Sequence, residues 1–201
     1  MSIAHEEAAL DAAAVDALFV EARTANSFTG EVTDEQAQAI YELTKFGPTA
    51  FNNQPLRITY VRSPEARERL VAHMSPGNQE KTRQAPLVAL LAFDTEWHEK
   101  WGQFLPAALR AKAMFDDDES LRHGTGRDNA HLQAGYFILA VRALGFAAGP
   151  MTGANFGAID AEFFPDAGRR SFLVVNIGLP GAEAFGPAKT KFAFEDVVET
   201  L

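Results

Sequence analysis

Apolar positions recur at helical spacing near the start of the chain, at Leu10, Ala14, Ala17 and Leu18. This period of three to four residues predicts a helix over about residues 6–22. Further on, the stretch TDEQ places Thr33 three residues before Gln36, the spacing of a capping box in which each side chain satisfies a backbone amide at the helix start. A second helix is therefore expected from this box to about residue 46, where a Gly-Pro pair would end it.

Three later stretches have the pattern of β-strands. Residues 57–61 (RITYV) alternate, so that Ile58 and Tyr60 share one face. Residues 85–94 and 171–180 are nearly continuous apolar runs of strand length, which is typical of strands that are buried on both faces.

Further helices are expected between and after these strands. Ser63 followed by Pro64 predicts the capped start of a short helix. Residues 128–144 are apolar nearly all round and are followed by Gly145, which predicts a buried helix with a glycine at its end. The C-terminal tail is expected to close with a short helix.

The stretch between the second strand and this buried helix is irregular. Residues 95–125 predict a surface excursion with some helix, in which the acidic run 116–119 would be a solvated loop. Trp97 and Trp101 are four residues apart and are expected to pack on one helical stripe. Because no repeat or low-complexity linker divides the chain, residues 1–201 are expected to form one α+β domain.

Composition narrows the classes of function. The chain is 47% hydrophobic and 22% charged, as in globular proteins, and its formal net charge is −9. This acidity argues against a nucleic-acid or anionic-membrane surface, so an anionic ligand would need a local group of cations. The start of the chain is acidic and amphipathic rather than basic and then apolar, and no apolar run reaches membrane-spanning length, so a cytoplasmic protein is expected.

Residue types also limit the chemistry. The chain has no cysteine, which excludes thiolate catalysis and iron–sulfur ligation, so a redox role would need an organic cofactor. None of the five histidines forms a pair with metal-ligand spacing and a nearby Glu, so no metal site is expected. Two glycine patterns are not nucleotide motifs: residues 145–153 follow a helix rather than a strand, and Pro187 stands where a phosphate-binding loop needs lysine.

Several polar stretches remain unexplained by turns alone. They are ARTANSF (residues 22–28), GPTAFNNQP (47–55), GNQEKT (77–82), GPMTG (149–153) and AKTK (188–191). Each one alone is more simply a turn or a solvated segment.

Together, these stretches resemble the nitroreductase superfamily of flavin mononucleotide (FMN) enzymes. The resemblance covers nearly the whole chain and is strongest for the branch assigned as malonic semialdehyde reductase of the Rut uracil-degradation pathway. The text that carries it is DALFVEARTANSF, KFGPTAFNNQP, SPGNQEKT, RALGFAAGPMTG and NIGLPG with the later FAFED. It implies an α+β fold with a mainly antiparallel central sheet flanked by helices, in an intertwined homodimer with two flavin sites at the interface.

The resemblance also implies which residues would hold the flavin phosphate. Arg23, with the neighbouring Ala25 and Asn26, would approach it from one segment, and Lys189 and Lys191 from the tail. A phosphate carries close to two negative charges and needs such fixed cations. The wider family usually has Lys-x-Arg in the tail, so the second lysine here replaces a planar fork by a point charge.

Other positions would face the ring system. Pro48, Thr49 and Asn52 match positions that edge the flavin and its ribityl chain, usually across the subunit interface. Asn78 and Lys81 match positions near the pyrimidine end, where a cation favours negative charge on the reduced ring. The strip over the other face is Pro150, Met151, Thr152 and Gly153. A glycine there would allow a backbone amide to approach the ring closely.

The implied activity is a hydride relay from NADPH or NADH through FMN to an acceptor. No side chain stands out as the general acid, and solvent is one candidate for that role. Three functions stay open: reduction of 3-oxopropanoate (malonic semialdehyde) to 3-hydroxypropanoate, a broad nitroaromatic or quinone reductase, and a flavin-binding protein without turnover. A carboxylated aldehyde needs a cation to hold its carboxylate. Arg127 is the first candidate, ahead of Lys112 and Arg122, and its alternative role is a solvated arginine that caps a loop.

Overall fold

A five-stranded antiparallel sheet forms the centre of the protein. The structure is a computed structural model that describes residues 3–106, 109–166 and 168–201. Its strands are β1 (Phe28–Thr29), β2 (Leu56–Val61), β3 (Leu87–Asp94), β4 (Ala147–Met151) and β5 (Arg169–Pro180). The strand order is β1-β5-β3-β2, and β4 also pairs with β5. In register, Thr59 of β2 lies opposite Leu90 of β3, which lies opposite Val174 of β5.

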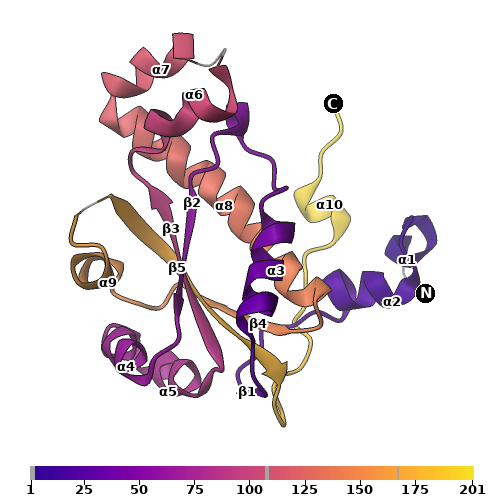
Figure 1. Cartoon of the computed structure of the whole chain (residues 1–201). Helices are drawn as coiled ribbons and strands as arrows, with labels where there is room; N and C mark the ends of the chain where they lie inside the picture. Colours follow the sequence, from indigo (N-terminus) through magenta and orange to yellow (C-terminus); the bar gives the residue numbers. More distant parts are fainter. Residues whose placement is uncertain (1–2, 107–108, 167) are drawn as a thin grey trace.

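Helices cover both faces of this sheet (Figure 1). In chain order, the α-helices before β3 are α1 (Ile3–Glu7), α2 (Ala12–Val15), α3 (Asp34–Thr44), α4 (Pro64–Ala72) and α5 (Pro76–Gln84). Those after β3 are α6 (Trp101–Phe104), α7 (Leu109–Asp116), α8 (Glu119–Ala143), α9 (Phe156–Phe163) and α10 (Phe194–Val197). A π-helix, η1 (Asp16–Val20), continues α2, and two 3-10 helices are η2 (Ala50–Asn52) and η3 (Trp97–Lys100).

The alternation of side chains along β3 divides the core into two layers. Leu87, Ala89 and Leu91 pack with residues of α3 and α8, whereas Val88 and Leu90 pack with residues of α4 and α9. All five side chains are fully buried. Because successive side chains of a strand point to opposite faces, one continuous apolar run supplies both layers.

The excursion between β3 and α8 has a small core of its own. Trp97, Trp101 and Phe115 are buried and meet edge to face, with ring centroids 4.8–5.5 Å apart. Gly126 of α8 lies against this cluster, since a Cβ atom there would be 2.8 Å from the Trp97 ring. The prediction that the two tryptophans pack on one stripe is therefore confirmed.

Several local predictions are confirmed. Thr33 and Gln36 form both bonds of the capping box at the start of α3. Ser63 caps α4, with Pro64 as its first residue. The predicted strands correspond to β2, β3 and β5, and the α+β fold with an antiparallel sheet is confirmed.

Other predictions were wrong, for reasons visible in the structure. The single helix over residues 6–22 is interrupted, because the Asp11 side chain accepts from the Ala14 amide and starts α2 anew. The helix expected at 128–144 begins at Glu119, because Asp118 caps it by accepting from the Leu121 amide. The acidic run 116–119 is therefore a helix junction rather than a solvated loop. Helices α5 and α9 and the short strands β1 and β4 were not predicted.

None of the described helices is both long enough and apolar enough to cross a membrane.

Candidate functional site

A cavity of about 700 Å³ lies where the N-terminal segment, the end of α8 and the C-terminal tail meet. Four cationic side chains line it: Arg23, Arg142, Lys189 and Lys191. None of the described residues that line it is acidic. In a chain with a net charge of −9, this concentration of positive charge is a local site for an anion.

The segment that carries Arg23 is fixed by backbone bonds on both sides. The Ala25 amide donates to the Ala148 carbonyl of β4 (3.1 Å), and the Asn26 amide donates to the Ala184 carbonyl (2.9 Å). The Arg23 guanidinium donates to the Val20 carbonyl (2.8 Å), at the end of the π-helix. The predicted phosphate residues Arg23, Lys189 and Lys191, which come from opposite ends of the chain, therefore lie in one cavity.

Helix α5 extends this site along β4. Lys81 Nζ lies 3.4 Å from the Asn26 side-chain oxygen, and the Asn78 side-chain amide donates to the Gly153 carbonyl (3.0 Å). A Cβ atom at residue 153 would lie 2.5 Å from Asn78 Nδ2, so the contact needs glycine. The Ser75 amide donates to the same Gly153 carbonyl (2.9 Å). The structure thus joins three predicted segments, 22–28, 77–82 and 149–153, into one surface.

Residues Pro150, Met151 and Thr152 complete the strip after α8. Pro150 and Met151 are the last residues of β4, where they lie opposite Val175 and Val174 of β5. Met151 is buried, and the Thr82 hydroxyl lies 3.9 Å from its sulfur. Thr152 is exposed beyond the end of the strand. The first half of the strip is thus a sheet edge, which explains why its backbone is fixed.

The loop with Pro48, Thr49 and Asn52 lies apart from these residues. It shares no described hydrogen bond with them and lines none of the described cavities that they line. Polar side chains of α8 hold it instead: Asn129 accepts from the Ala50 amide (2.6 Å) and Gln133 from the Leu56 amide (3.0 Å). A single chain therefore contains two separate parts of the predicted site.

This loop is also conformationally unusual. Phe51, Asn52 and Gln54 have positive φ angles of 51°, 55° and 44°. Such angles are uncommon for residues other than glycine and persist where neighbours hold them. Trp101 provides one such restraint, because its indole N–H donates to the Phe51 carbonyl (2.8 Å). Asn53 is 4% exposed, and neither polar atom of its side chain has a hydrogen-bond partner. It lines a second cavity of about 450 Å³, where these atoms could bind a group that enters the cavity.

The three candidates for an acceptor-binding cation do not lie at either part of the site. Arg127 lies inside α8 rather than before it, is 60% exposed, and bonds the Asp128 carboxylate (3.0 Å). Lys112 bonds Glu99 (2.9 Å), and Arg122 donates to the Phe115 carbonyl (2.6 Å). The expectation that Arg127 ends the excursion was wrong, because α8 starts eight residues earlier at Glu119.

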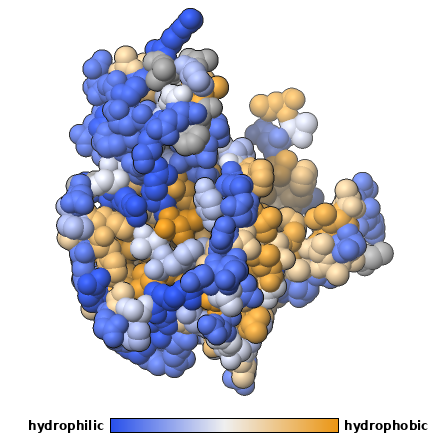
Figure 2. Space-filling view, in the orientation of Figure 1, coloured by the Kyte–Doolittle hydropathy of each residue, from blue (hydrophilic) through white to orange (hydrophobic). Residues whose placement is uncertain are grey.

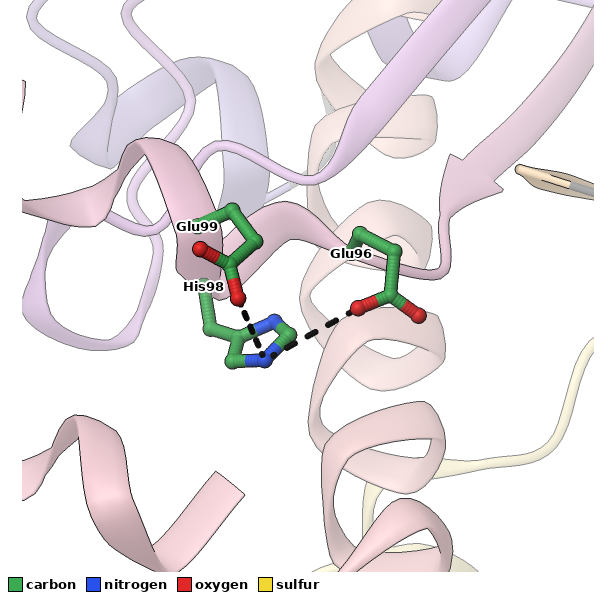
Figure 3. Close-up of side chains that lie close together, drawn as sticks. All are labelled: Glu96, His98 and Glu99. Atoms are coloured by element: carbon green, nitrogen blue, oxygen red, sulfur yellow. Dashed lines mark ion pairs between the residues drawn. The ribbon is translucent and has the colours of Figure 1, made fainter. Parts of the chain in front are cut away.

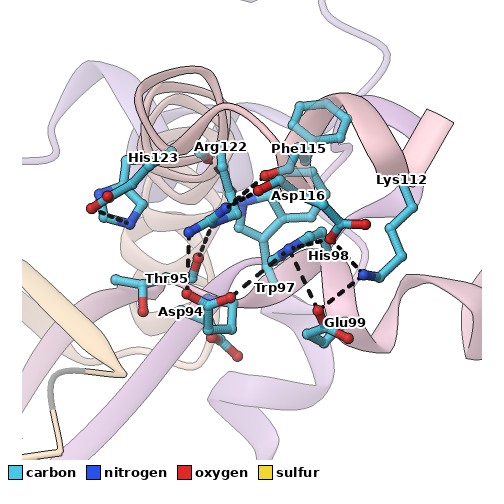
Figure 4. Close-up of polar contacts among 12 residues, drawn as sticks. Asp94, Thr95, Trp97, His98, Glu99, Lys112, Phe115, Asp116, Arg122 and His123 are labelled. Carbon is cyan, nitrogen blue, oxygen red and sulfur yellow. Dashed lines mark hydrogen bonds and ion pairs between the residues drawn. The ribbon is translucent and has the colours of Figure 1, made fainter.

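A carboxylate–histidine cluster in the excursion is a further concentration of titratable groups (Figure 3). His98 Nε2 lies 3.0 Å from the Asp116 carboxylate, and 3.8 Å and 3.6 Å from those of Glu96 and Glu99. Lys112 and Arg122 also bond these carboxylates, so two cations compensate most of the negative charge of the three (Figure 4). Burial lowers the pKa of His98, and Arg122 lowers it further. We assign this network to the joining of η3 with α7 and α8.

Arg142 and the α8 amides were missed by the sequence analysis. Arg142 is a charged residue near the end of a helix that is predicted to be apolar nearly all round. This departure from the pattern could have indicated it. Asn129 and Gln133 lie on that same helix, so their polar side chains were a second signal. Both α8 amides are nearly buried, at 8% and 5% exposure.

Comparisons with known proteins place this arrangement in context. Residues 28–178 match the Nitroreductase family. A Streptomyces coelicolor protein with the provisional name NADH dehydrogenase/NAD(P)H nitroreductase is 56% identical over 193 residues, which cover 96% of this chain and 98% of that protein. Two solved structures have TM-scores of 0.82 at 17% identity: a provisionally named nitroreductase of Exiguobacterium sibiricum in complex with FMN, and the enone reductase CLA-ER of gut-bacterial fatty acid saturation. They cover 97% and 95% of this chain, and 99% of their own chains.

Proposed function

The chain belongs to the nitroreductase family, and we propose that it is an FMN-dependent NAD(P)H oxidoreductase. The observation that carries the proposal is the convergence of Arg23, Lys189 and Lys191 on one cavity that has no described acidic lining. Two of the comparisons support these cofactors. The Exiguobacterium structure of similar fold contains FMN, and the Streptomyces relative is named as an NAD(P)H nitroreductase.

The residues present fit FMN. Its phosphate requires cations, and the cavity of about 700 Å³ supplies them. Its ring system presents both hydrogen-bond donors and acceptors, which the side-chain amides of Asn26 and Asn78 can match. A side chain at residue 153 would collide with Asn78 and Ser75, so glycine lets these residues pack closely against the strip.

The chain's own residues position the cofactor and polarise its ring system, whereas the cofactor carries the redox chemistry. FMN, when bound, would supply two-electron transfer between NADPH or NADH and an acceptor. Lys81, held beside Asn26, would provide positive charge that stabilises negative charge developing next to it. Arg23, Lys189 and Lys191 would hold the phosphate, and the segment 150–153 would position the ring. The acceptor takes its proton from solvent.

The active form is a homodimer in this proposal. Pro48, Thr49 and Asn52 would complete the site of the partner subunit, which accounts for their separation from the cationic cavity. Strand β2 is at the edge of the described sheet, where no other strand pairs with its outer side. Large apolar side chains are exposed on and after α3, at Tyr41, Leu43 and Phe46, and on the tail, at Phe192, Phe194, Val197, Val198 and Leu201. Figure 2 shows apolar surface on the side from which both terminal segments project. A surface of this kind is typical of a subunit interface.

The acceptor that we propose is 3-oxopropanoate, reduced to 3-hydroxypropanoate in pyrimidine breakdown. The support is the sequence resemblance, since the fold hosts enzymes with different acceptors. A nitroaromatic or quinone acceptor is the second candidate, favoured by the name of the Streptomyces relative. A flavin-binding protein without turnover is the third.

Two measurements on the purified protein test these proposals. A flavin absorption spectrum, with FMN released on denaturation, tests the cofactor; a colourless protein that does not bind added FMN contradicts it. Steady-state oxidation of NADPH and of NADH with 3-oxopropanoate, a nitroaromatic compound or a quinone separates the three functions. A higher kcat/KM for 3-oxopropanoate supports the first, a higher value for the others supports the second, and no turnover with any acceptor supports the third.

A further inference from the structure

Arg142 is a partly buried cation that forms no ion pair among the described residues. It lies in the last turn of α8, where its guanidinium donates to the Leu18 carbonyl (3.2 Å). Its Nε atom is buried and has no hydrogen-bond partner, and no described carboxylate forms an ion pair with it. Burial lowers the pKa of this side chain, which means that its surroundings oppose the positive charge.

An unpaired charge in such a position destabilises the protein that carries it. Taking a cation out of water costs free energy that one neutral carbonyl only partly restores. The other cations of the cavity are better solvated: Lys189 and Lys191 are exposed, and Arg23 bonds two carbonyls and the exposed Glu21. Arg142 is therefore the cation of this cavity that gains most from an anion.

Burial also changes how much a cation contributes to recognition. Solvent and salt screen the exposed lysines, whereas a partly buried guanidinium acts through a lower dielectric. A guanidinium also presents several N–H donors in a fixed plane, which suits the oxygens of a phosphate. Charge, burial and donor geometry thus point to the same class of ligand, a phosphomonoester.

We propose that Arg142 is a phosphate-binding residue and that it makes the cavity select the phosphorylated flavin, FMN, over uncharged riboflavin. The proposal rests on the FMN-binding function proposed above. It assigns discrimination to the buried end of the cavity, and retention to the exposed lysines of the tail. The cost of holding this charge without a ligand is the basis of the selectivity, because only an anion removes it.

The substitution R142M tests this assignment, because methionine keeps much of the aliphatic volume and removes the charge. The dissociation constants of FMN and riboflavin are measured on flavin-free protein by fluorescence quenching. We expect R142M to weaken FMN binding by about 10- to 100-fold and to leave riboflavin binding within about twofold. The flavin-free variant should also melt at or above the temperature of flavin-free wild type. The matched control is R69M, since Arg69 is 57% exposed and bonds Glu162 on the other face of the sheet.

The ratio of the two affinities decides the outcome. An FMN-to-riboflavin ratio in R142M equal to that of wild type overturns the role of Arg142, whatever the melting temperature. Wild-type protein that binds neither flavin overturns the proposed function itself, so the two failures are distinguishable. If R142M does not fold, R142Q gives the same comparison, because its amide can still donate to the Leu18 carbonyl.

Discussion

The side-chain amide of Asn78 donates to the backbone carbonyl of Gly153 over 3.0 Å, joining the first turn of α5 to the segment that follows β4. The Ser75 amide bonds the same carbonyl oxygen (2.9 Å). Two donors on one acceptor fix the direction of this peptide group. The Gly153 end of the strip expected to face the flavin is therefore held by the start of α5 and its cap residue.

The substitution G153A is expected to disturb this contact, because its Cβ would lie 2.5 Å from Asn78 Nδ2. Loss of one hydrogen bond corresponds to about 1 kcal/mol, so we expect FMN affinity to fall about fivefold. The measurement is fluorescence titration of flavin-free protein. The control is G157A, where a Cβ would meet its nearest neighbour at an ordinary 3.7 Å. Equal affinities of the two variants would contradict a role for Gly153.

The double substitution K189A/K191A is expected to yield colourless or easily stripped protein. Both lysines line the cationic cavity but are exposed, so each contributes up to about 1 kcal/mol and together they account for about a 10-fold loss of FMN affinity. Flavin content after dialysis measures the effect. R69A/R83A removes the same charge from outside the cavity and should retain flavin. Full occupancy in K189A/K191A would show that the phosphate lies elsewhere.

The homodimer predicts a particle of twice the 21.9 kDa chain mass in sedimentation at micromolar concentration. Phe46 is 73% exposed at the end of α3, within the proposed interface. We expect F46E to shift the protein towards monomer and to lower flavin content, because Pro48, Thr49 and Asn52 would no longer reach a partner's site. A wild-type monomer with fully bound flavin is the result that refutes the interface placement.

The His98 network predicts a loss of stability in mild acid. Burial lowers the pKa of folded His98 below its ordinary value of 6.5, so the unfolded chain binds a proton more readily. The stability that His98 contributes is thus complete above about pH 6.5 and falls as the pH decreases towards the folded pKa. Asp116 also destabilises the protein when it is protonated, at a lower pH than His98. The hydrogen bond from Lys112 lowers the pKa of folded Asp116 below its ordinary value of 3.8.

Thermal unfolding at pH 7.5, 6.5 and 5.5 measures this dependence. H98Q cannot take up a proton in this range and keeps a donor for Asp116, so its melting temperature should decrease less than that of wild type. Parallel curves for the two proteins would show that His98 does not titrate between the folded and unfolded states.

R127A tests the proposed acid acceptor. If Arg127 holds the carboxylate of 3-oxopropanoate, its removal should lower kcat/KM for that substrate by roughly 30- to 150-fold, the effect of about 2–3 kcal/mol. Activity with a neutral quinone should be unchanged. Equal loss with both acceptors, or with neither, removes Arg127 from the acceptor site. In the single chain this residue is exposed beside Asp128, so a role would require that the partner or the acceptor covers it.

Local sequence rules predicted the elements whose signals are local. The capping box at Thr33, the Ser-Pro start of α4 and the apolar runs of β3 and β5 each depend on neighbours in the chain. Helix α5 was missed because its residues are mostly polar, and β4 because Gly149 and Pro150 are atypical of a strand. Strand β4 exists through its pairing with β5, where a Cβ at Gly149 would lie 2.9 Å from the Ala25 carbonyl.

In the candidate site, too, some residues could be predicted from the sequence and others could not. The sequence resemblance indicated the residues from distant segments, and the structure brings Arg23, Lys189 and Lys191 together. The resemblance did not include Arg142, whose one sequence signal is its charge near the end of a helix predicted to be apolar. Nor could it indicate that Asn129 and Gln133 hold the loop of residues 47–55, since those bonds connect positions 79 and 77 residues apart.

Strand β5 pairs with β1, β3 and β4, yet it is the last strand of the chain. During synthesis on the ribosome, the first four strands emerge before the one that unites them. Only β2 and β3 can pair without it, so the other edge of β3 and much of the apolar face of α9 stay uncovered until residues 169–180 are available. Closure of the sheet is then a late, long-range event, which slows folding and lengthens the exposure of the nascent chain to aggregation. Truncations before residue 180 should therefore depend on chaperones for solubility, while truncations after it keep the sheet intact.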